Sequence, residues 1–121
     1  MTSSERFSRA SRLAKSSDIR RLLNTGRRMR TGHLEFLWSD NVAGLPRMGL
    51  IVPKYQSTGV ARNRLRRRLK ELWRREVQGS TPPVDLLVRA RREAYAATFA
   101  ALRSEVHAWR ETVAGSPDAA P

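Results

Sequence analysis

The sequence predicts a small α/β protein, a two-layer sandwich in which helices cover a mixed central sheet. Three observations favour this fold class. Residues alternate in polarity over 33–38, short apolar runs occupy 48–52 and 84–88, and helical apolar stripes follow at 65–77 and 95–113. In chain order the elements are a helix, two strands, a basic helix, a strand and a last helix. The 121 residues leave room for one domain over the whole chain.

The first helix is predicted to begin at Ser16-Ser17-Asp18. Serine and aspartate side chains there can accept hydrogen bonds from the free N–H groups of a first helical turn. The apolar positions of this helix are Ile19, Leu22 and Leu23. Gly26 is well placed just past its end. The basic cluster Arg27-Arg28-Met29-Arg30 follows, and we expect it to lie in a turn.

Three segments read as strands. From His33 the period becomes two, and the alternation separates Leu34, Phe36 and Trp38 from His33, Glu35 and Leu37. The run at 48–52 is continuously apolar, which is typical of a central strand, and Pro53 ends it. The run at 84–88 predicts another buried strand.

Two amphipathic helices complete the pattern. The segment 62–77 carries one apolar stripe, formed by Leu65, Leu69, Leu72, Trp73 and Val77. The last helix carries a second stripe, formed by Tyr95, Phe99, Leu102, Val106, Trp109 and Val113. We expect the head of Arg62 to swing clear of the first stripe. Residues 1–12 are predicted to form a mobile basic arm and residues 115–121 a disordered tail.

The charge of the chain indicates an anionic partner. Lys and Arg number 24 against 11 Asp and Glu, which leaves a formal net charge of +13. A polyanion explains this excess, because each phosphate that a protein neutralises releases a condensed counterion. The absence of cysteine excludes disulfide scaffolds, cysteine-based zinc sites and thiol nucleophiles. No apolar run resembles a membrane span or a secretory signal, so we expect a cytoplasmic protein.

Positive charge is concentrated in the segment 62–75, which holds eight basic residues and one acid. Its neighbours at i,i+4 include Arg64 with Arg68, Arg66 with Lys70, and Arg67 with Glu71. Two of these pairs repel and one attracts, a cost that binding to an anion would offset. Arginine outnumbers lysine here, which favours bidentate phosphate contacts and stacking on bases. A membrane surface is the alternative anion, but binding it would expose the apolar stripe that the strands need as cover.

The sequence shows no constellation typical of a catalytic site. His33 and His107 fall in different elements. Asp18, Asp40 and Asp85 lack the paired spacing of a metal-dependent nuclease. Glycine-rich phosphate loops and the HExxH zinc motif are absent. We therefore predict that the protein carries no active site of its own.

Aromatic side chains can also contribute to nucleic-acid binding, since unpaired bases stack on them. Phe36, Trp38 and Tyr55 are candidates because they lie in or beside the strands. The aromatic residues of the helical stripes are predicted to lie in the core, and these are Trp73, Tyr95, Phe99 and Trp109.

One stretch of the sequence is similar to a known signature. Residues 60–70 read VARNRLRRRLK and follow the short strand segment GLIVPK at 49–54, and the strand DLLVRA lies at 85–90. In this order they resemble the bacterial ribonuclease P protein subunit, over residues 12–110. The Arg-Asn-Arg triplet alone is a weak signal. Its position between an apolar strand and a basic amphipathic helix makes it a strong one.

The resemblance implies an auxiliary subunit of a ribozyme. The RNA subunit, with its Mg²⁺ ions, would hydrolyse the 5′ leader from precursor tRNA. The protein would bind the catalytic RNA and the leader, assist catalysis and broaden the substrate range, with no organic cofactor, membrane or protein partner. The whole chain would be one RNA-binding domain. The resemblance also implies the order α-β-β-(β)-α-β-α, with the basic helix in a left-handed βαβ crossover.

Site residues carry over from the same resemblance. Contacts to the RNA subunit are expected from Lys54, Arg62, Asn63, Arg64, Arg66, Arg67, Arg68 and Lys70. Contacts to the 5′ leader are expected from Ile19, Leu23, Phe36 and Tyr55. Ile19 and Leu23 stand where the family often has phenylalanine, so van der Waals contact would replace stacking. The segment 53–59 also departs from the family's usual residues.

Two other functions fit the composition. A ribosomal or other structural RNA-binding protein would be equally basic. Sequence-specific DNA binding through the helix at 62–75 is the other possibility, but Pro53 and a polar loop precede that helix instead of the partner helix of a helix-turn-helix.

Overall fold

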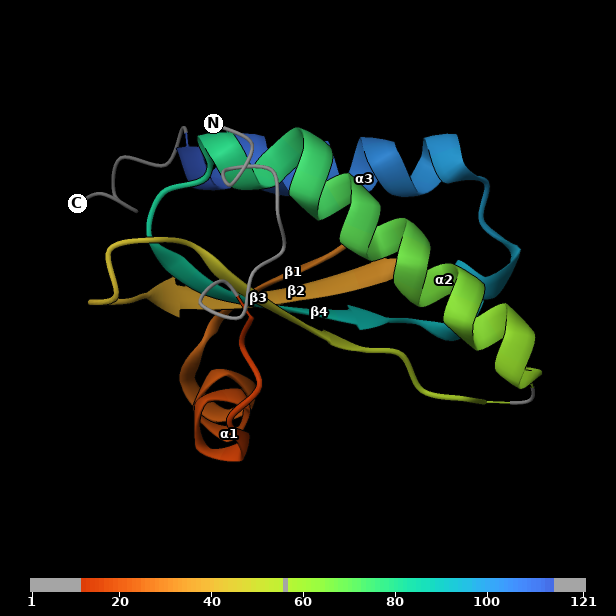
Figure 1. Cartoon of the computed structure of the whole chain (residues 1–121), viewed down its shortest axis with the longest axis horizontal. Coiled ribbons are helices and arrows are strands. Elements are labelled where there is room, and N and C mark those ends of the chain that lie inside the picture. Colours follow the sequence, from red (N-terminus) through yellow and green to blue (C-terminus); the bar gives the residue numbers. More distant parts are fainter. Residues whose placement is uncertain (1–11, 56, 115–121) are drawn as a thin grey trace.

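The computed structural model describes residues 12–55 and 57–114, and they form a four-stranded sheet with helices on both faces (Figure 1). The main elements are α1 (Ser16–Thr25), β1 (Arg27–Arg30), β2 (Leu34–Asp40), β3 (Arg47–Ile51), α2 (Gly59–Leu72), β4 (Val84–Ala90) and α3 (Phe99–Ala114). Short helical turns follow α2 (η3, Trp73–Val77, and η4, Gln78–Ser80) and precede α3 (η5, Arg92–Ala96). The order α-β-β-β-α-β-α agrees with the expected one, including its optional third strand.

The sheet is mixed, with the strand order β1-β2-β4-β3. β2 pairs antiparallel with β1 and β4, whereas β3 and β4 are parallel neighbours. A parallel pair needs a crossover connection, and α2 provides it. The basic helix therefore lies in the βαβ unit, as expected. The hand of that crossover stays a prediction.

The main core lies between the sheet and the pair α2 and α3. The apolar face of β2 meets the stripes of both helices, and its aromatic side chains surround Trp109 of α3. The rings of Phe36 and Trp109 are stacked, with centroids 5.9 Å apart, and Trp38 meets Trp109 edge-on at 5.9 Å. These contacts fix α3 on the sheet.

A third layer makes the two-layer prediction wrong. Leu22 of α1 is fully buried against Leu37 of β2, Leu87 of β4 and Leu13, on the face opposite α2 and α3 (Figure 1). Side chains alternate across a strand, so Leu37 and Leu87 point away from the main core and need a cover of their own. α1 provides that cover.

The basic cluster Arg27–Arg30 forms the edge strand β1, and the predicted turn is wrong. Its register with β2 pairs Arg27 with Trp38 and Arg30 with Glu35. Arg27 also forms an ion pair with Asp40 at 3.2 Å. A highly charged strand suits an edge, because its side chains reach water while its backbone is paired on one side.

β3 lies at the other edge of the sheet, so the prediction of a central strand is wrong. Its apolar residues are nevertheless covered by the segment at Arg12 and Leu13. Arg12 forms an isolated parallel β-bridge with Met48, and the Leu13 N–H donates to the Met48 carbonyl oxygen at 3.0 Å. This segment approaches closely at Gly49, where a Cβ atom would lie 2.4 Å from the Leu13 carbonyl oxygen. Glycine at this position therefore allows the segment to cover the edge.

The helix ends differ from prediction at the two long helices. α2 begins at Gly59, three residues before the expected start, because the Thr58 side chain caps it by accepting from the Ala61 N–H at 3.0 Å. α3 begins at Phe99, and Tyr95 lies in η5, where its hydroxyl donates to the Pro53 carbonyl oxygen. The predicted capping of α1 by Ser16, Ser17 or Asp18 is wrong, because Lys15 holds the N-cap position and no side chain of the described residues caps it, whereas Gly26 follows the last residue of α1 as predicted.

The predicted mobile arm lies outside the described residues except for Arg12, and the predicted disordered tail lies outside them entirely. Within the described ranges, no helix has the length and apolar character to cross a membrane.

Candidate nucleic-acid interface

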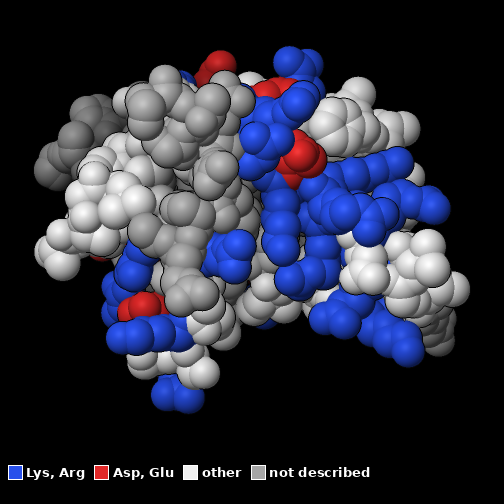
Figure 2. Space-filling view, in the orientation of Figure 1, with Lys and Arg blue, Asp and Glu red and all other residues white. Residues whose placement is uncertain are grey.

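Basic side chains gather over α2 on the face of the molecule shown in Figure 2. The burial of Leu65, Leu69 and Leu72 against the sheet sets the rotation of this helix. Arg64 and Arg67 consequently point to solvent, as the helical projection predicts. Arg66, Arg68 and Lys70 are partly covered and line the flanks of the same surface.

The start of α2 is anchored by one of its own arginines. Arg62 is exposed, and its Nε donates to the carbonyl oxygen of Val52 at 2.7 Å, so its head is tied to the chain just after β3. The carbonyl at the end of β3 needs a donor, and Arg62 supplies it. Asn63 beside it and Lys54 in the preceding loop are exposed. The signature residues thus lie at one end of α2, close to the end of β3.

Among the described residues, the arginines on α2 form no ion pair with an acidic side chain. Glu71 pairs with Arg74 at 2.8 Å and with Arg75 at 3.3 Å, instead of with Arg67 as the spacing suggests. Within the described ranges no ion pair is formed by the remaining basic residues of this surface, which are Arg64, Arg66, Arg67, Arg68 and Lys70. Their charge is available to an external anion.

Lys70 lies in a groove between α2 and the segment that covers β3. The groove is also lined by Arg12, Ile19, Gly49 and Arg66. Burial lowers the pKa of Lys70, and the like charges of Arg66 and Arg12 lower it further. A phosphate in this groove would stabilise all three cations, because an opposite charge favours their charged forms.

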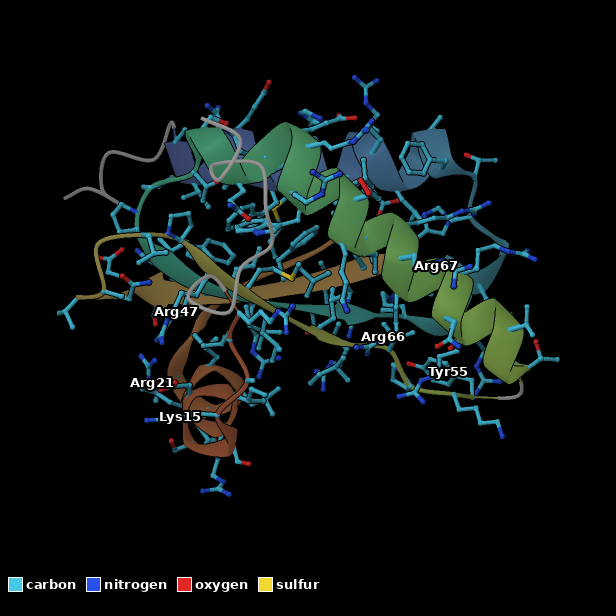
Figure 3. The ribbon with its side chains drawn as sticks, in the orientation of Figure 1. Lys15, Arg21, Arg47, Tyr55, Arg66 and Arg67 are labelled. Carbon is cyan, nitrogen blue, oxygen red and sulfur yellow. The ribbon has the colours of Figure 1, made fainter. Side chains whose placement is uncertain are left out.

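A buried carboxylate fixes α1 to the sheet on the other side. Asp85 accepts two hydrogen bonds from Arg47, each 2.8 Å, and further bonds from Arg21 at 3.0 Å and Asn41 at 2.9 Å. Burial raises the pKa of Asp85, but the hydrogen bonds from Arg47 and Asn41 outweigh it and hold that pKa below its ordinary value. Arg21 lies on α1 and Arg47 on β3, whereas Arg66 and Arg67 lie on α2 (Figure 3).

The residues expected to touch the 5′ leader do not lie together. Ile19 and Leu23 of α1 are half-buried beside the Leu22 cluster. Tyr55 is 39% exposed in the loop before α2, where it donates to the Ala90 carbonyl oxygen. Phe36 is fully buried against Trp109 on the opposite face, so its predicted leader contact is wrong.

Two other aromatic predictions are also wrong. The sequence makes Trp38 a stacking candidate, but only 7% of it is exposed, because it packs on Trp109. Phe99 was expected in the core, but it is 41% exposed at the first residue of α3. Phe99 lies three residues before Leu102 and therefore on the apolar stripe. It is also the first residue of α3, so no earlier turn of the helix covers its ring.

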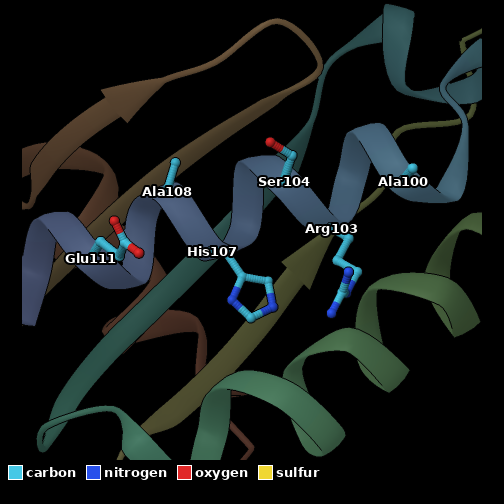
Figure 4. Close-up of a pocket in the computed structure, with 6 residues that line it drawn as sticks. All are labelled: Ala100, Arg103, Ser104, His107, Ala108 and Glu111. Carbon is cyan, nitrogen blue, oxygen red and sulfur yellow. The ribbon is translucent and has the colours of Figure 1, made fainter.

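Each histidine forms an ion pair with a glutamate of another element. The Nε2 of His107 bonds to Glu76 at 2.7 Å, and the Nε of Arg103 donates to the same oxygen at 2.7 Å. Both side chains extend from α3 toward the green ribbon of α2 and its continuation (Figure 4). The ring Nδ1 and the backbone N–H of His33 both bond to the carboxylate of Glu105. In the ranges that the structure describes, no three His, Asp or Glu residues are grouped so that they could hold a metal ion.

Comparison with known proteins decides the family. The sequence model described as Ribonuclease P matches residues 7–113. The chain belongs to the bacterial ribonuclease P protein family. Relatives named ribonuclease P protein component include that of Syntrophobacter fumaroxidans, 36% identical over 75% of this chain and 77% of its own. That of Clostridioides difficile is 31% identical over 77% of this chain and 82% of its own.

Solved ribonuclease P proteins share the fold. The structure from Staphylococcus aureus has a TM-score of 0.74 at 21% identity, and covers 80% of this chain and 89% of its own. The structure from Thermotoga maritima has a TM-score of 0.73 at 22% identity, and covers 82% and 94%. Membership makes this chain a component of the ribonuclease P holoenzyme, an endoribonuclease of tRNA 5′ processing. It decides against the ribosomal and DNA-binding alternatives.

Proposed function

We propose that this chain binds the ribonuclease P RNA subunit through α2 and the loop before it. The observation that carries the proposal is the set of arginines on α2 that have no acidic partner among the described residues. The contacting residues are Lys54, Arg62, Asn63, Arg64, Arg66, Arg67, Arg68 and Lys70. Guanidinium groups bind phosphates bidentately, so a rigid row of them suits a folded RNA backbone.

The 5′ leader of precursor tRNA is the proposed second ligand. Ile19 and Leu23 present a half-buried apolar surface on α1, and Tyr55 presents part of its ring near the start of α2. The groove lined by Ile19, Arg66 and Lys70 connects α1 to α2. A single strand of RNA can use such a path because its bases contact apolar side chains while its phosphates meet cations. Leader contacts of this kind would broaden the substrate range.

Chemistry is assigned to the RNA subunit. Mg²⁺ bound there would supply the hydrolytic step. The contribution of the protein is to neutralise phosphates where the RNA subunit and the substrate meet. The left-handed crossover implied by the family belongs to this proposal, as does a cytoplasmic site of action.

The test is affinity for the RNA subunit with charge-matched variants. R64A/R67A removes two exposed arginines from α2, whereas R27A/R110A removes two from β1 and α3. We expect R64A/R67A to weaken binding at least tenfold and to reduce the log–log salt slope by about 1.4 to 1.8, because two phosphate contacts are lost. R27A/R110A should change the affinity and the salt slope by much less. Equal losses in both variants would remove α2 from the interface.

A further inference from the structure

Phe99 is an exposed aromatic residue beside the basic surface of α2. It is 41% exposed, whereas Leu102, Val106 and Trp109 of the same helix are buried. The buried residues of α3 hold the helix on the sheet, and the Thr98 side chain caps its start by accepting from the Ala101 N–H at 3.0 Å. Leaving a phenylalanine ring partly in water has a cost. Another role of the ring would account for it.

The ring lines a pocket whose other walls are mainly guanidinium groups. The lining residues besides Phe99 are Arg64, Arg67, Arg68, Glu71, Arg75 and Glu76. They come from α2 and from η3, the turn that continues it. The pocket therefore combines one apolar wall with several cations, within the surface that Figure 2 shows as predominantly basic.

The two acids of this pocket are already paired. Glu71 is held by Arg74 and Arg75, and Glu76 by Arg103 and His107 (Figure 4 shows the last two). The remaining cations of the pocket are Arg64, Arg67 and Arg68, which have no acidic partner in the part of the chain that the structure describes. The hydrogen bonds of His107 and Arg103 also lower the pKa of Glu76, so that carboxylate stays ionised and bound to α3.

We propose that this pocket binds an unpaired nucleotide of the RNA subunit, with its base stacked on Phe99 and its phosphate on Arg64, Arg67 or Arg68. The inference rests on the proposed function and deepens it. Unpaired bases stack on aromatic rings, and arginine can bind a phosphate or stack on the same base. Stacking is sequence-tolerant, so the pocket would recognise an extruded nucleotide and not a particular base.

Phe99→Trp places a fluorescent side chain in the pocket, so that ligand binding there can be measured by tryptophan fluorescence. The chain's three tryptophans, Trp38, Trp73 and Trp109, are at most 7% exposed, so they should respond little to a ligand. A tryptophan at position 99 should be quenched when the in vitro transcribed RNA subunit binds. Val42→Trp is the matched control, because Val42 is fully exposed in the β2–β3 loop. Equal quenching in both variants would overturn the proposal.

Affinity measurements separate stacking from packing. Phe99→Leu keeps an apolar side chain, whereas Phe99→Tyr keeps the ring. We expect F99L to bind the RNA subunit roughly 5- to 160-fold more weakly, the range for loss of one stacked base, with an unchanged salt slope. F99Y should bind like the wild type. Thermal unfolding of each variant should match the wild type, since the side chain is exposed.

The failures of the two proposals are distinguishable. If the wild-type chain binds the RNA subunit but F99L binds equally well, the nucleotide pocket is wrong and the interface on α2 stands. If F99L loses affinity only together with thermal stability, the role of Phe99 is packing and the pocket is again wrong. If the wild-type chain does not bind the RNA subunit, both proposals fail.

Discussion

Arg62 joins the first turn of α2 to Val52, the residue that follows β3, with its Nε 2.7 Å from the Val52 carbonyl oxygen. This bond fixes the part of the chain that carries the Arg-Asn-Arg signature. It makes the first arginine of the signature a structural residue as well as a candidate RNA contact. The second arginine, Arg64, is exposed and makes no such bond to the residues that the structure describes.

Arg62→Ala should therefore affect both stability and binding. Loss of one hydrogen bond from a charged donor, partly exposed, should lower the free energy of unfolding by about 1 kcal/mol. Arg64→Ala should leave that free energy within about 0.5 kcal/mol of the wild type, as for other surface changes. Urea unfolding measures both. Equal stability of the two variants would contradict a structural role for Arg62.

Phe36→Ala tests the assignment of Phe36 to the core. Removal of a fully buried ring that stacks on Trp109 should cost about 3–5 kcal/mol of unfolding free energy. Phe36→Leu should cost less and leave a foldable protein. That variant should bind precursor and mature tRNA with the same preference as the wild-type holoenzyme. A selective loss of precursor binding in F36L would restore Phe36 to the leader site.

Ile19 and Leu23 carry the remaining apolar leader contacts on α1. The double variant I19A/L23A should weaken precursor tRNA binding by the holoenzyme several-fold and leave mature tRNA binding unchanged, since only the precursor has a leader. Both side chains are half-buried, so thermal unfolding must be measured in parallel. Leu22→Ala, at the buried centre of that cluster, is the comparison for a purely structural loss. Equal losses for both tRNAs would place these residues outside the leader site.

Asp85 should make the fold sensitive to acid. Its pKa is lowered in the folded state, so its ionised form adds stability above the unfolded pKa of about 3.9, and this stability is lost as the pH falls through the lower folded pKa. Asp85→Asn should destabilise the protein by about 3 kcal/mol near pH 7, because Arg47 and Arg21 lose a buried partner. The difference from the wild type should shrink below about pH 4.

Asp40→Asn is the control for this prediction. Its side chain is 78% exposed and pairs only with Arg27 among the described residues. Surface pairs of this kind contribute little, so the variant should unfold like the wild type at every pH. If Asp85→Asn showed the same constant difference from pH 7 to pH 3, the lowered pKa of Asp85 would be contradicted.

Local patterns predicted the elements whose own residues carry the signal. The alternation around Phe36 specifies β2, and the stripe from Leu65 to Val77 specifies α2. Alternation does not say which face meets which helix, so it could not show that Phe36 points to α3 and Leu37 to α1. β1 has three arginines in four residues and is a strand only because β2 pairs with it.

The other incorrect predictions also concern features that depend on tertiary contacts. An apolar run such as that of β3 is equally compatible with a central strand and with an edge covered by Leu13. The exposure of Phe99 depends on where α3 begins, which the Thr98 cap decides. For the site, the row of basic residues on α2 was readable from the sequence, and Glu71 pairing with Arg74 and Arg75 was not.

The most direct test of the central claim is precursor tRNA cleavage at low Mg²⁺ by the cognate RNA subunit, with and without this protein. We predict that the RNA subunit alone cleaves poorly under these conditions and that the wild-type chain restores accurate removal of the 5′ leader. R64A/R67A should restore it only at higher protein concentration. Equal cleavage with and without the wild-type chain would contradict its role as the protein subunit.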